Sequence, residues 1–313
     1  MTIEQFGGKV LEYLKKVLES ECQIEFREVT KNNGVCLHSI VITAKDCNVS
    51  PAIYIDEMFE AYQNGRTFKD IAYDILCAYY QYVREPNMNM EFFTQFAQAK
   101  NKLLYKLVNA KDNRELLPEV PYIEWNDLVL IFYYLFEDEQ IGRATILIRN
   151  THLKMWGINM DTLYETAQEN MLRLCPEELT PIQQIVEELV DMRCNSQEEG
   201  APMEFPEGFR IEMAQDVSMY VLSNRSRLFG ASALLYAKSL KRLAEELNRN
   251  LVVLPSSVHE VLVVPDDGVT KKDFFANMVK EVNDTQVDRE EILSYSIYYY
   301  DRASDQVSIM LPV

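Results

Sequence analysis

The 313-residue sequence contains few of the residues that mark special classes of protein: ten glycines, eleven prolines and six cysteines. The scarcity of glycine and proline excludes collagen-like and low-complexity chains. The cysteines form no Cys-x-x-Cys pair, which argues against a disulfide framework or a paired-cysteine zinc site. We therefore expect reduced thiols at Cys22, Cys36, Cys47, Cys77, Cys175 and Cys194.

The sequence also lacks long apolar segments. Its most hydrophobic run, residues 128–136, is far shorter than the roughly 20 residues that a membrane-spanning helix needs. The first twenty residues are amphipathic and contain neither a continuous apolar region nor a small-residue cleavage site, so they do not resemble a signal peptide. We expect a cytoplasmic protein without membrane association.

Basic residues are in the minority, since 31 Lys and Arg oppose 49 Asp and Glu and give a net charge of −18. Long-range repulsion therefore disfavours general binding to nucleic acids or anionic membranes. The acidic excess is concentrated in residues 1–204, which carry 33 acidic and 19 basic residues, against 16 and 12 in the remainder. We interpret this region as a solvated surface; the alternatives are a DNA-mimicking or a cation-binding face.

Local patterns predict an α+β protein. Thr2 and Gln5 have the spacing of a helix-capping box, and apolar residues then recur every three to four positions, as in a helix. Two extended runs flank Asn33-Gly34, a dipeptide that favours a hairpin turn. We expect antiparallel sheets with helices packed on one face. The predicted helices cover residues 68–79, 90–108 and 161–174, and a second hairpin covers 128–149.

The last third has the clearest pattern, with strands and helices in the order β-α-β-β-α-β followed by one added strand. Its first helix is predicted over residues 228–247. This order resembles the split βαβ, ferredoxin-like unit. Residues 195–208 (NSQEEGAPMEFPEG) are polar and contain two prolines and two glycines, as linkers do. We therefore predict an N-terminal acidic α+β domain (1–194), a linker (195–208) and a C-terminal α+β domain (209–313).

No standard catalytic or nucleotide-binding motif is present. The three histidines, His38, His152 and His259, are far apart in the sequence. Cys36 and His38 would share one face of a strand, but two ligands do not complete a zinc site. We interpret these two residues as a thiol and an imidazole on a half-exposed strand, and we expect no metal and no cofactor.

Two segments of the last third could carry chemistry. The loop between a strand and a helix contains Asn224, Arg225, Ser226 and Arg227, and a helix start with arginines and hydroxyl groups can hold an anion. In the segment Pro255-Ser256-Ser257-Val258-His259-Glu260, Ser257 and His259 would share a face of an extended strand. A Ser–His pair can activate a nucleophile, although Glu260 would point to the opposite face. The alternative interpretations are a capped helix start and a buried imidazole.

The same residues resemble a known family. The run YVLSNRSRLFGASALLYAKSLKRLAEELNRNLVVLPSSVHEVLVVPDDG is similar to uncharacterised proteins of gut-dwelling Gram-positive anaerobes that are classed as a domain of unknown function. The preceding RNTHLKMWGINMDTLYETAQENMLRLCP fits the same family. The resemblance implies a full-length bacterial protein and supplies no activity. It is most specific at Asn224, Gly230, Tyr236, Pro255, Ser256, Ser257, His259 and Glu260.

The sequence thus leaves the activity unknown and favours a non-catalytic cytoplasmic protein that binds a protein partner or a small, anionic ligand. The alternative is an enzyme, a hydrolase or transferase, acting on an anionic substrate. In that case Arg225 and Arg227 would hold the anion, and His259 with Ser257 would act as base or nucleophile partner.

Overall fold

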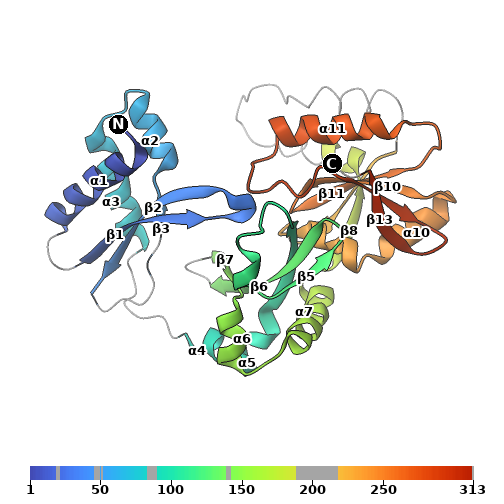
Figure 1. Cartoon of the computed structure of the whole chain (residues 1–313), viewed down its shortest axis with the longest axis horizontal. Coiled ribbons are helices and arrows are strands. Elements are labelled where there is room, and N and C mark those ends of the chain that lie inside the picture. Colours follow the sequence, from blue (N-terminus) through green and yellow to red (C-terminus); the bar gives the residue numbers. More distant parts are fainter. Residues whose placement is uncertain are drawn as a thin grey trace. The chain divides into compact units, whose positions relative to one another are not determined.

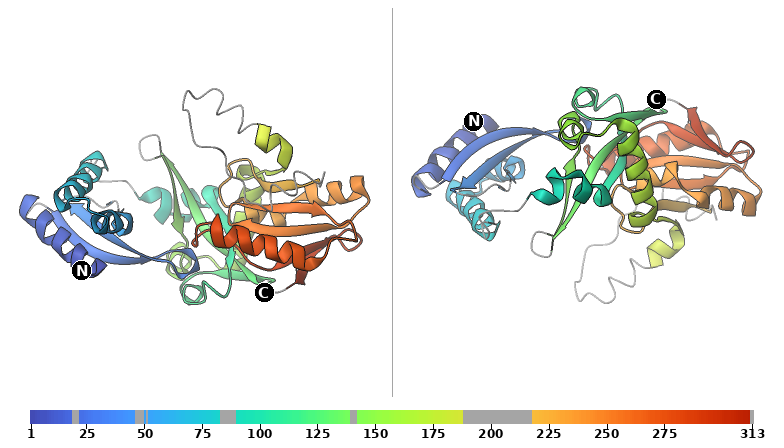
Figure 2. Two further views of the ribbon diagram at one scale, coloured as in Figure 1. Left: turned by 90° about the horizontal axis from the view of Figure 1, so that it is seen from above. Right: turned by 90° about the horizontal axis from the view of Figure 1, so that it is seen from below.

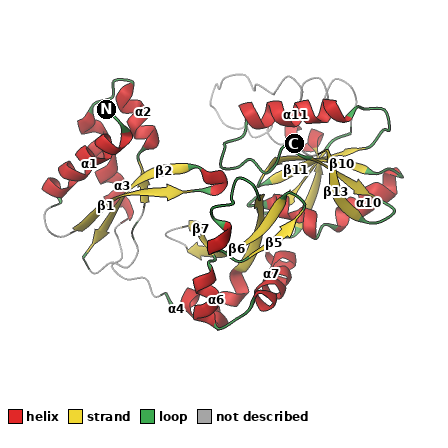
Figure 3. Ribbon diagram, viewed as in Figure 1, coloured by secondary structure: helices red, strands yellow, loops and turns green. Residues whose placement is uncertain are grey.

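A computed structural model describes residues 1–18, 22–45, 50, 52–82, 90–138, 142–187 and 218–311. The chain forms two compact units, residues 1–92 and 93–313, which are described in turn (Figure 1). Helices combine with three antiparallel sheets (Figure 3). The predicted α+β class is therefore confirmed.

The first unit begins with α1 (Ile3–Val17), whose start has the predicted capping box. The side chains of Thr2 and Gln5 each accept a hydrogen bond from the other residue's backbone N–H. This reciprocal pair satisfies two amide groups that the first turn of a helix leaves unpaired. Phe6, Val10 and Leu14 follow on one face of the helix and are fully buried.

The predicted hairpin consists of β1 (Cys22–Thr30) and β2 (Cys36–Ala44). Its connection contains η2 (Asn32–Gly34), where Asn33 and Gly34 have φ of 56° and 65°. β3 (Ala52–Tyr54) pairs with the other edge of β2. Ile24, Ile40 and Ile42 of the hairpin form one core with α1, α2 (Asp56–Gln63) and α3 (Phe68–Tyr82).

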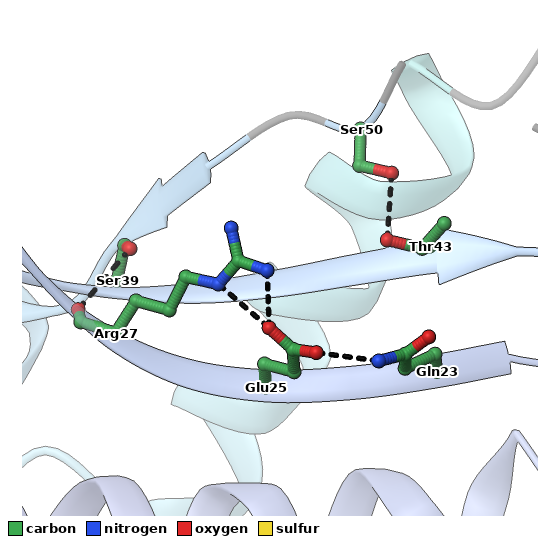
Figure 4. A network of polar contacts seen from close by, with 6 residues as sticks. All are labelled: Gln23, Glu25, Arg27, Ser39, Thr43 and Ser50. Carbon is green, nitrogen blue, oxygen red and sulfur yellow. Dashed lines mark hydrogen bonds and ion pairs between the residues drawn. The ribbon is translucent and has the colours of Figure 1, made fainter. Parts of the chain in front are cut away.

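The opposite face of this sheet carries a polar network (Figure 4). Arg27 Nε donates a hydrogen bond to Glu25 at 2.6 Å, and Ser39 Oγ donates to the Arg27 carbonyl at 3.3 Å. Gln23 also donates to Glu25, and Ser50 Oγ donates to Thr43 at 3.0 Å. The described helices of the first unit therefore pack on the face of the sheet that is opposite this network.

The prediction of one continuous helix over residues 90–108, at the start of the second unit, is wrong. The short helices α4 (Glu91–Thr94), α5 (Phe96–Ala99) and η3 (Lys100–Lys102) lead into β4 (Leu103–Asn109). Five residues of β4 are buried, on both faces of the strand, so its near-continuous apolar sequence imitated helical periodicity.

β4 pairs with the long strand β6 (Leu128–Asp138). β5 (Tyr122–Trp125) and β7 (Gly142–Leu147) pair with β6 as well, and β6 with β7 forms the second predicted hairpin. The short helix η4 (Leu117–Glu119) precedes β5. Two helices follow the sheet, α6 (Asn150–Trp156) and α7 (Met160–Leu174).

A six-stranded sheet occupies the rest of the second unit, in the order β13-β12-β10-β11-β9-β8. Both β9 and β10 pair antiparallel with β11. β9 and β10 are therefore parallel to each other with β11 between them, which is a split arrangement; the closer ferredoxin-like resemblance stays a prediction. The strands are β8 (Glu177–Pro181), β9 (Tyr220–Asn224), β10 (Leu251–Ser257), β11 (Glu260–Pro265), β12 (Ile297–Asp301) and β13 (Gln306–Leu311).

The predicted linker at residues 195–208 lies outside the described residues. β8 precedes it and β9 follows it, yet these two strands pair antiparallel, with Leu179 opposite Leu222. The proposed domains 1–194 and 209–313 therefore share a sheet, and the compact units divide between residues 92 and 93 instead. Composition identified a polar segment but carries no information about strands that pair across it.

The helix predicted over residues 228–247 consists of two pieces, the 3₁₀ helix η5 (Gly230–Leu235) and α10 (Lys238–Leu247). α11 (Lys272–Thr285) lies along one face of the six-stranded sheet (Figure 2). Leu251 and Tyr300 are on the other face, and Tyr300 is close to Glu245 of α10. Helices therefore cover both faces of this sheet, unlike the single covered face expected from the β-α-β-β-α-β order.

Candidate functional site

The loop at residues 223–230 meets the hairpin turn at residues 257–260, and we call this contact the Phe229–His259 junction. Ser223 Oγ donates a hydrogen bond to the His259 carbonyl at 2.7 Å. The Phe229 backbone N–H donates to Nδ1 of His259 at 3.2 Å. The two rings stack, with centroids 5.5 Å apart and planes 13° from parallel. The two candidate segments are thus close together on neighbouring strands.

Gly230 allows this close approach. A Cβ atom at this position would lie 2.1 Å from Ser223 Oγ, 2.4 Å from the His259 carbonyl oxygen and 2.7 Å from the Asn224 amide nitrogen. Two of these neighbours are backbone atoms that cannot move independently. Only glycine therefore fits where the loop crosses the hairpin turn.

The loop itself contains two residues with unusual backbone conformations. Arg227 and Phe229 have φ of 51° and 52°, in the left-handed region that costs a residue with a side chain about 1–2 kcal/mol. The Asn224 carbonyl accepts the Arg227 N–H at 2.9 Å, and Asn224 Nδ2 donates to the Leu228 carbonyl at 2.9 Å. These bonds and the His259 contact hold the loop in its strained shape.

Both nitrogens of the His259 ring are engaged in the junction. Because Nδ1 accepts the Phe229 N–H, the neutral ring carries its proton on Nε2. Nε2 lies 3.4 Å from a carboxylate oxygen of Glu291. The ring therefore connects three separate segments of the chain, and its lone pair is used inside the fold.

Ser257 does not contact the His259 ring through its hydroxyl group. β10 ends at Ser257, and Val258 and His259 form the turn, so the two side chains do not share an extended strand as expected. Ser257 Oγ instead accepts the backbone N–H of His259 at 3.1 Å. Glu260 is the first residue of β11. The hydroxyl group thus closes the turn, which is a common role for serine.

The four residues considered for ligand binding divide into two pairs. Asn224 is fully buried and its Oδ1 accepts a hydrogen bond from Ser226 Oγ at 2.9 Å, so this pair shapes the loop from within. Arg225 and Arg227 are the two exposed residues among the four.

Sequence reasoning missed three residues of the junction. Glu291 is 32 positions from His259, and its carbonyl accepts the Val258 N–H at 2.8 Å. Lys106 Nζ lies 4.1 Å from the centre of the Phe229 ring, and the Tyr133 ring contacts Phe229 edge to face at 5.1 Å. These residues come from other elements, and no local pattern marks them.

A buried group of hydroxyl and thiol side chains lies beside this region. Burial raises the pKa of the Cys175 thiol to about 11 and also raises the pKa of Tyr133. Tyr236 Oη donates to the Cys175 carbonyl at 2.7 Å. A thiol with a raised pKa is a poor nucleophile, so Cys175 is suited to packing.

The pair Cys36 and His38, considered for metal binding, lies in the first unit. The pKa of the Cys36 thiol is raised by desolvation and by the charges of Glu28 and Asp56. His38 Nδ1 is 2.9 Å from Asp56 Oδ1. Over the part of the chain that the structure describes, no three His, Cys, Asp or Glu side chains are grouped to hold a metal ion.

The geometry defines an α+β protein in which a loop and a hairpin turn meet in a tightly packed junction. The chain belongs to a family of unknown function (DUF5688), whose model matches residues 3–302. No curated protein and no solved structure matches the chain. Among the described residues, no helix has both the length and the apolar character to span a membrane.

Proposed function

We propose that this chain is a non-catalytic bacterial cytoplasmic protein that binds a protein partner or a small ligand through the loop at residues 223–230. One observation carries the proposal: the His259 ring and the Ser257 hydroxyl are occupied in shaping this region, while Arg225 and Arg227 are exposed. The four cysteines that the structure describes are unpaired, which supports a reducing compartment.

The strained backbone supports a recognition role for the loop. Unfavourable conformations persist only where the surroundings impose them, and they are frequent at ligand-binding segments. A loop fixed before binding loses little conformational entropy when a ligand arrives. The two guanidinium groups favour an anionic partner, because arginine binds carboxylate and phosphate with two parallel hydrogen bonds.

Titration of the full chain with inorganic phosphate and with a glutamate-rich peptide tests the proposal. We expect binding of at least one of these probes, and an affinity at least about tenfold lower in the Arg225→Ala/Arg227→Ala variant, because each hydrogen bond to a charged group contributes about 1.5–3 kcal/mol. The matched control is Arg242→Ala/Arg302→Ala, which removes two exposed guanidinium groups elsewhere in the second unit. Equal losses in both variants, or no binding of either probe, would contradict the proposal.

The enzyme alternative is favoured by one observation, the contact between the arginine-bearing loop and His259. A general base needs a free lone pair on the imidazole, and here Nδ1 already accepts an amide N–H. Hydrolysis of p-nitrophenyl phosphate distinguishes the two functions. Turnover that disappears in His259→Asn, a variant whose Oδ1 can still accept the Phe229 N–H, would establish the enzyme and reject the binding protein.

A further inference from the structure

The hydrogen bond between the Phe229 N–H and the His259 ring requires a neutral imidazole. The N–H donates to Nδ1 at 3.2 Å, and only an unprotonated ring nitrogen has a lone pair that can accept it. In the imidazolium form both ring nitrogens are donors, so the Phe229 N–H and an Nδ1–H would point at each other. Turning the ring over would bring Cδ2–H to this place, which cannot accept either. Proton uptake therefore removes this bond in both ring orientations.

This bond helps to hold an unfavourable backbone conformation. Phe229 has φ of 52° and ψ of 36°, in the left-handed region that is unfavourable for a residue with a Cβ atom. Arg227, two positions earlier, is left-handed as well. Such conformations persist only where surrounding contacts impose them. Loss of the bond to His259 therefore favours opening of the segment that carries Arg225 and Arg227.

The charged groups around the ring do not replace the lost acceptor. The Glu291 carboxylate lies 3.4 Å from Nε2, the other ring nitrogen, so it attracts the imidazolium without accepting the Phe229 N–H. Lys106 Nζ lies 4.1 Å from the centre of the Phe229 ring, and its charge opposes a second cation. Tyr133, whose ring contacts Phe229, stays neutral because burial raises its pKa. Charged neighbours along the chain are Arg225, Arg227 and Glu260.

The other two histidines of the chain respond differently to acid. Nδ1 of His38 donates to Asp56, so a proton adds at Nε2 and the existing bond becomes a stronger, charge-assisted one. Nδ1 of His152 accepts the Arg149 N–H at 3.1 Å, but desolvation and the charge of Arg149 lower the pKa of His152. His152 therefore stays neutral to a lower pH, and in mild acid the backbone bond at risk is that of His259.

We propose that His259 is a pH-dependent latch for the loop at residues 223–230: the neutral ring holds the Phe229 N–H, and proton uptake releases it and loosens the loop. The latched loop fits only the neutral ring, whereas the open loop accepts the cation. The latch is therefore closed at high pH and weakens as the pH falls. It stands on this geometry alone, and its effect on ligand binding rests on the proposed function of Arg225 and Arg227.

Hydrogen exchange of the Phe229 amide in the full chain, without any ligand, measures the latch. Its protection factor, which is corrected for the intrinsic pH dependence of exchange, should fall about tenfold between about pH 8 and about pH 5.5. The reason is that an imidazole in water, with a pKa of about 6.5, is about tenfold more often charged than neutral at the lower pH. In His259→Asn, whose Oδ1 accepts the same N–H at both pH values, the protection factor should not change. An unchanged protection factor in the wild type, or an equal fall in His259→Asn, would overturn the proposal.

Two further variants complete the test. His259→Phe has no acceptor at either pH, so its protection factor should be low and independent of pH. His152→Asn removes the other imidazole of the second unit, and the fall at Phe229 should persist in it; disappearance of the fall would assign the effect to the start of α6 and reject the latch.

If a His259 variant does not fold, NMR of the wild type decides the question. The nitrogen signals of the His259 ring and the amide signal of Phe229 should change with the same pH midpoint, and different midpoints would reject the latch. Because these measurements use no ligand, failure of the latch leaves the binding proposal standing, and absence of binding leaves the latch standing.

Discussion

His38 in the first unit and His259 in the second have similar surroundings. His38 stacks on Phe26 with centroids 5.7 Å apart and planes 16° from parallel, and His259 stacks on Phe229 at 5.5 Å and 13°. Each ring lies near one carboxylate, Asp56 or Glu291. Both imidazoles are partly exposed, with 14% and 28% of their side-chain surface accessible.

The two rings differ in the partner of Nδ1. In His38, Nδ1 faces the Asp56 carboxylate, which can only accept, so Nδ1 carries the proton and Nε2 has the lone pair. In His259, Nδ1 accepts the Phe229 N–H, so the proton is on Nε2. The more conspicuous sequence motif surrounds His259, whose Nδ1 lone pair accepts a hydrogen bond inside the fold. In His38 the lone pair is on Nε2 instead, because Nδ1 donates to Asp56. A motif therefore does not reveal the tautomer of its histidine.

The largest effect is expected from Gly230→Ala in the second unit. The Cβ atom of the alanine would overlap the His259 carbonyl and the Asn224 amide. Such overpacking lowers the free energy of unfolding by as much as about 3 kcal/mol, and occasionally by more. Urea unfolding followed by tryptophan fluorescence measures this loss, because both tryptophans, Trp125 and Trp156, belong to the second unit.

Gly8→Ala is the matched control for this prediction. Gly8 lies in α1 of the first unit, and a methyl group added there would meet no neighbouring atom within 4 Å. The fluorescence midpoint should stay unchanged in this variant. A Gly230→Ala protein as stable as the wild type would show that the junction is looser than its geometry indicates.

An effect of intermediate size on stability is expected from Asp56, the carboxylate beside His38, and a smaller one from Glu291, the carboxylate beside His259. Asp56 accepts both the backbone N–H of His38 at 2.8 Å and its ring Nδ1–H. We expect Asp56→Asn to destabilise the first unit by about 1.5–2 kcal/mol. Glu291 is 42% exposed and 3.4 Å from His259, so Glu291→Gln should cost about 0.5 kcal/mol or less. Hydrogen exchange within each unit measures both; similar losses would remove the distinction between the histidines.

A smaller effect than that of Asp56→Asn is expected from the acceptor role of His259. His259→Phe keeps a ring against Phe229 and removes the acceptor for its N–H, so we expect a loss of about 1 kcal/mol. His259→Asn should restore part of this loss, because its Oδ1 can accept the same N–H. Nitrogen NMR of the wild type provides a direct check: the proton should be on Nδ1 in His38 and on Nε2 in His259, and the reverse pattern would contradict the assignment.

Local signals predicted many of the elements. Thr2 with Gln5 marked the start of α1, and Asn33-Gly34 marked the first turn, because capping and positive φ depend on neighbouring residues. The prediction for β4 was wrong, since an apolar strand buried on both faces has no clear period of two. The interruption between η5 and α10 was missed for a related reason. Its apolar residues repeat every three to four positions although the helix does not continue.

The candidate site was only partly predictable. The sequence singled out the loop after β9 and the Ser257–His259 segment as separate candidates, and the structure shows that these segments meet. It gave neither the partner of each ring nitrogen nor the contribution of Glu291. Likewise, Asn283 is an ordinary helical residue in the sequence, and only the packing of α11 on the sheet buries its oxygen, for which the described part of the chain supplies no donor.

The sequence by itself determined that this chain is a mixed helix and sheet protein with excess negative charge, because turn formation, helix capping and charge depend on single residues and their neighbours in the sequence. The pairing of β8 with β9, the location of the unit boundary and the proton positions on the imidazoles depended on contacts between residues far apart in the chain. Such contacts form only when the sheets assemble, because hydrogen-bonding groups that are distant in the sequence then become neighbours and satisfy one another.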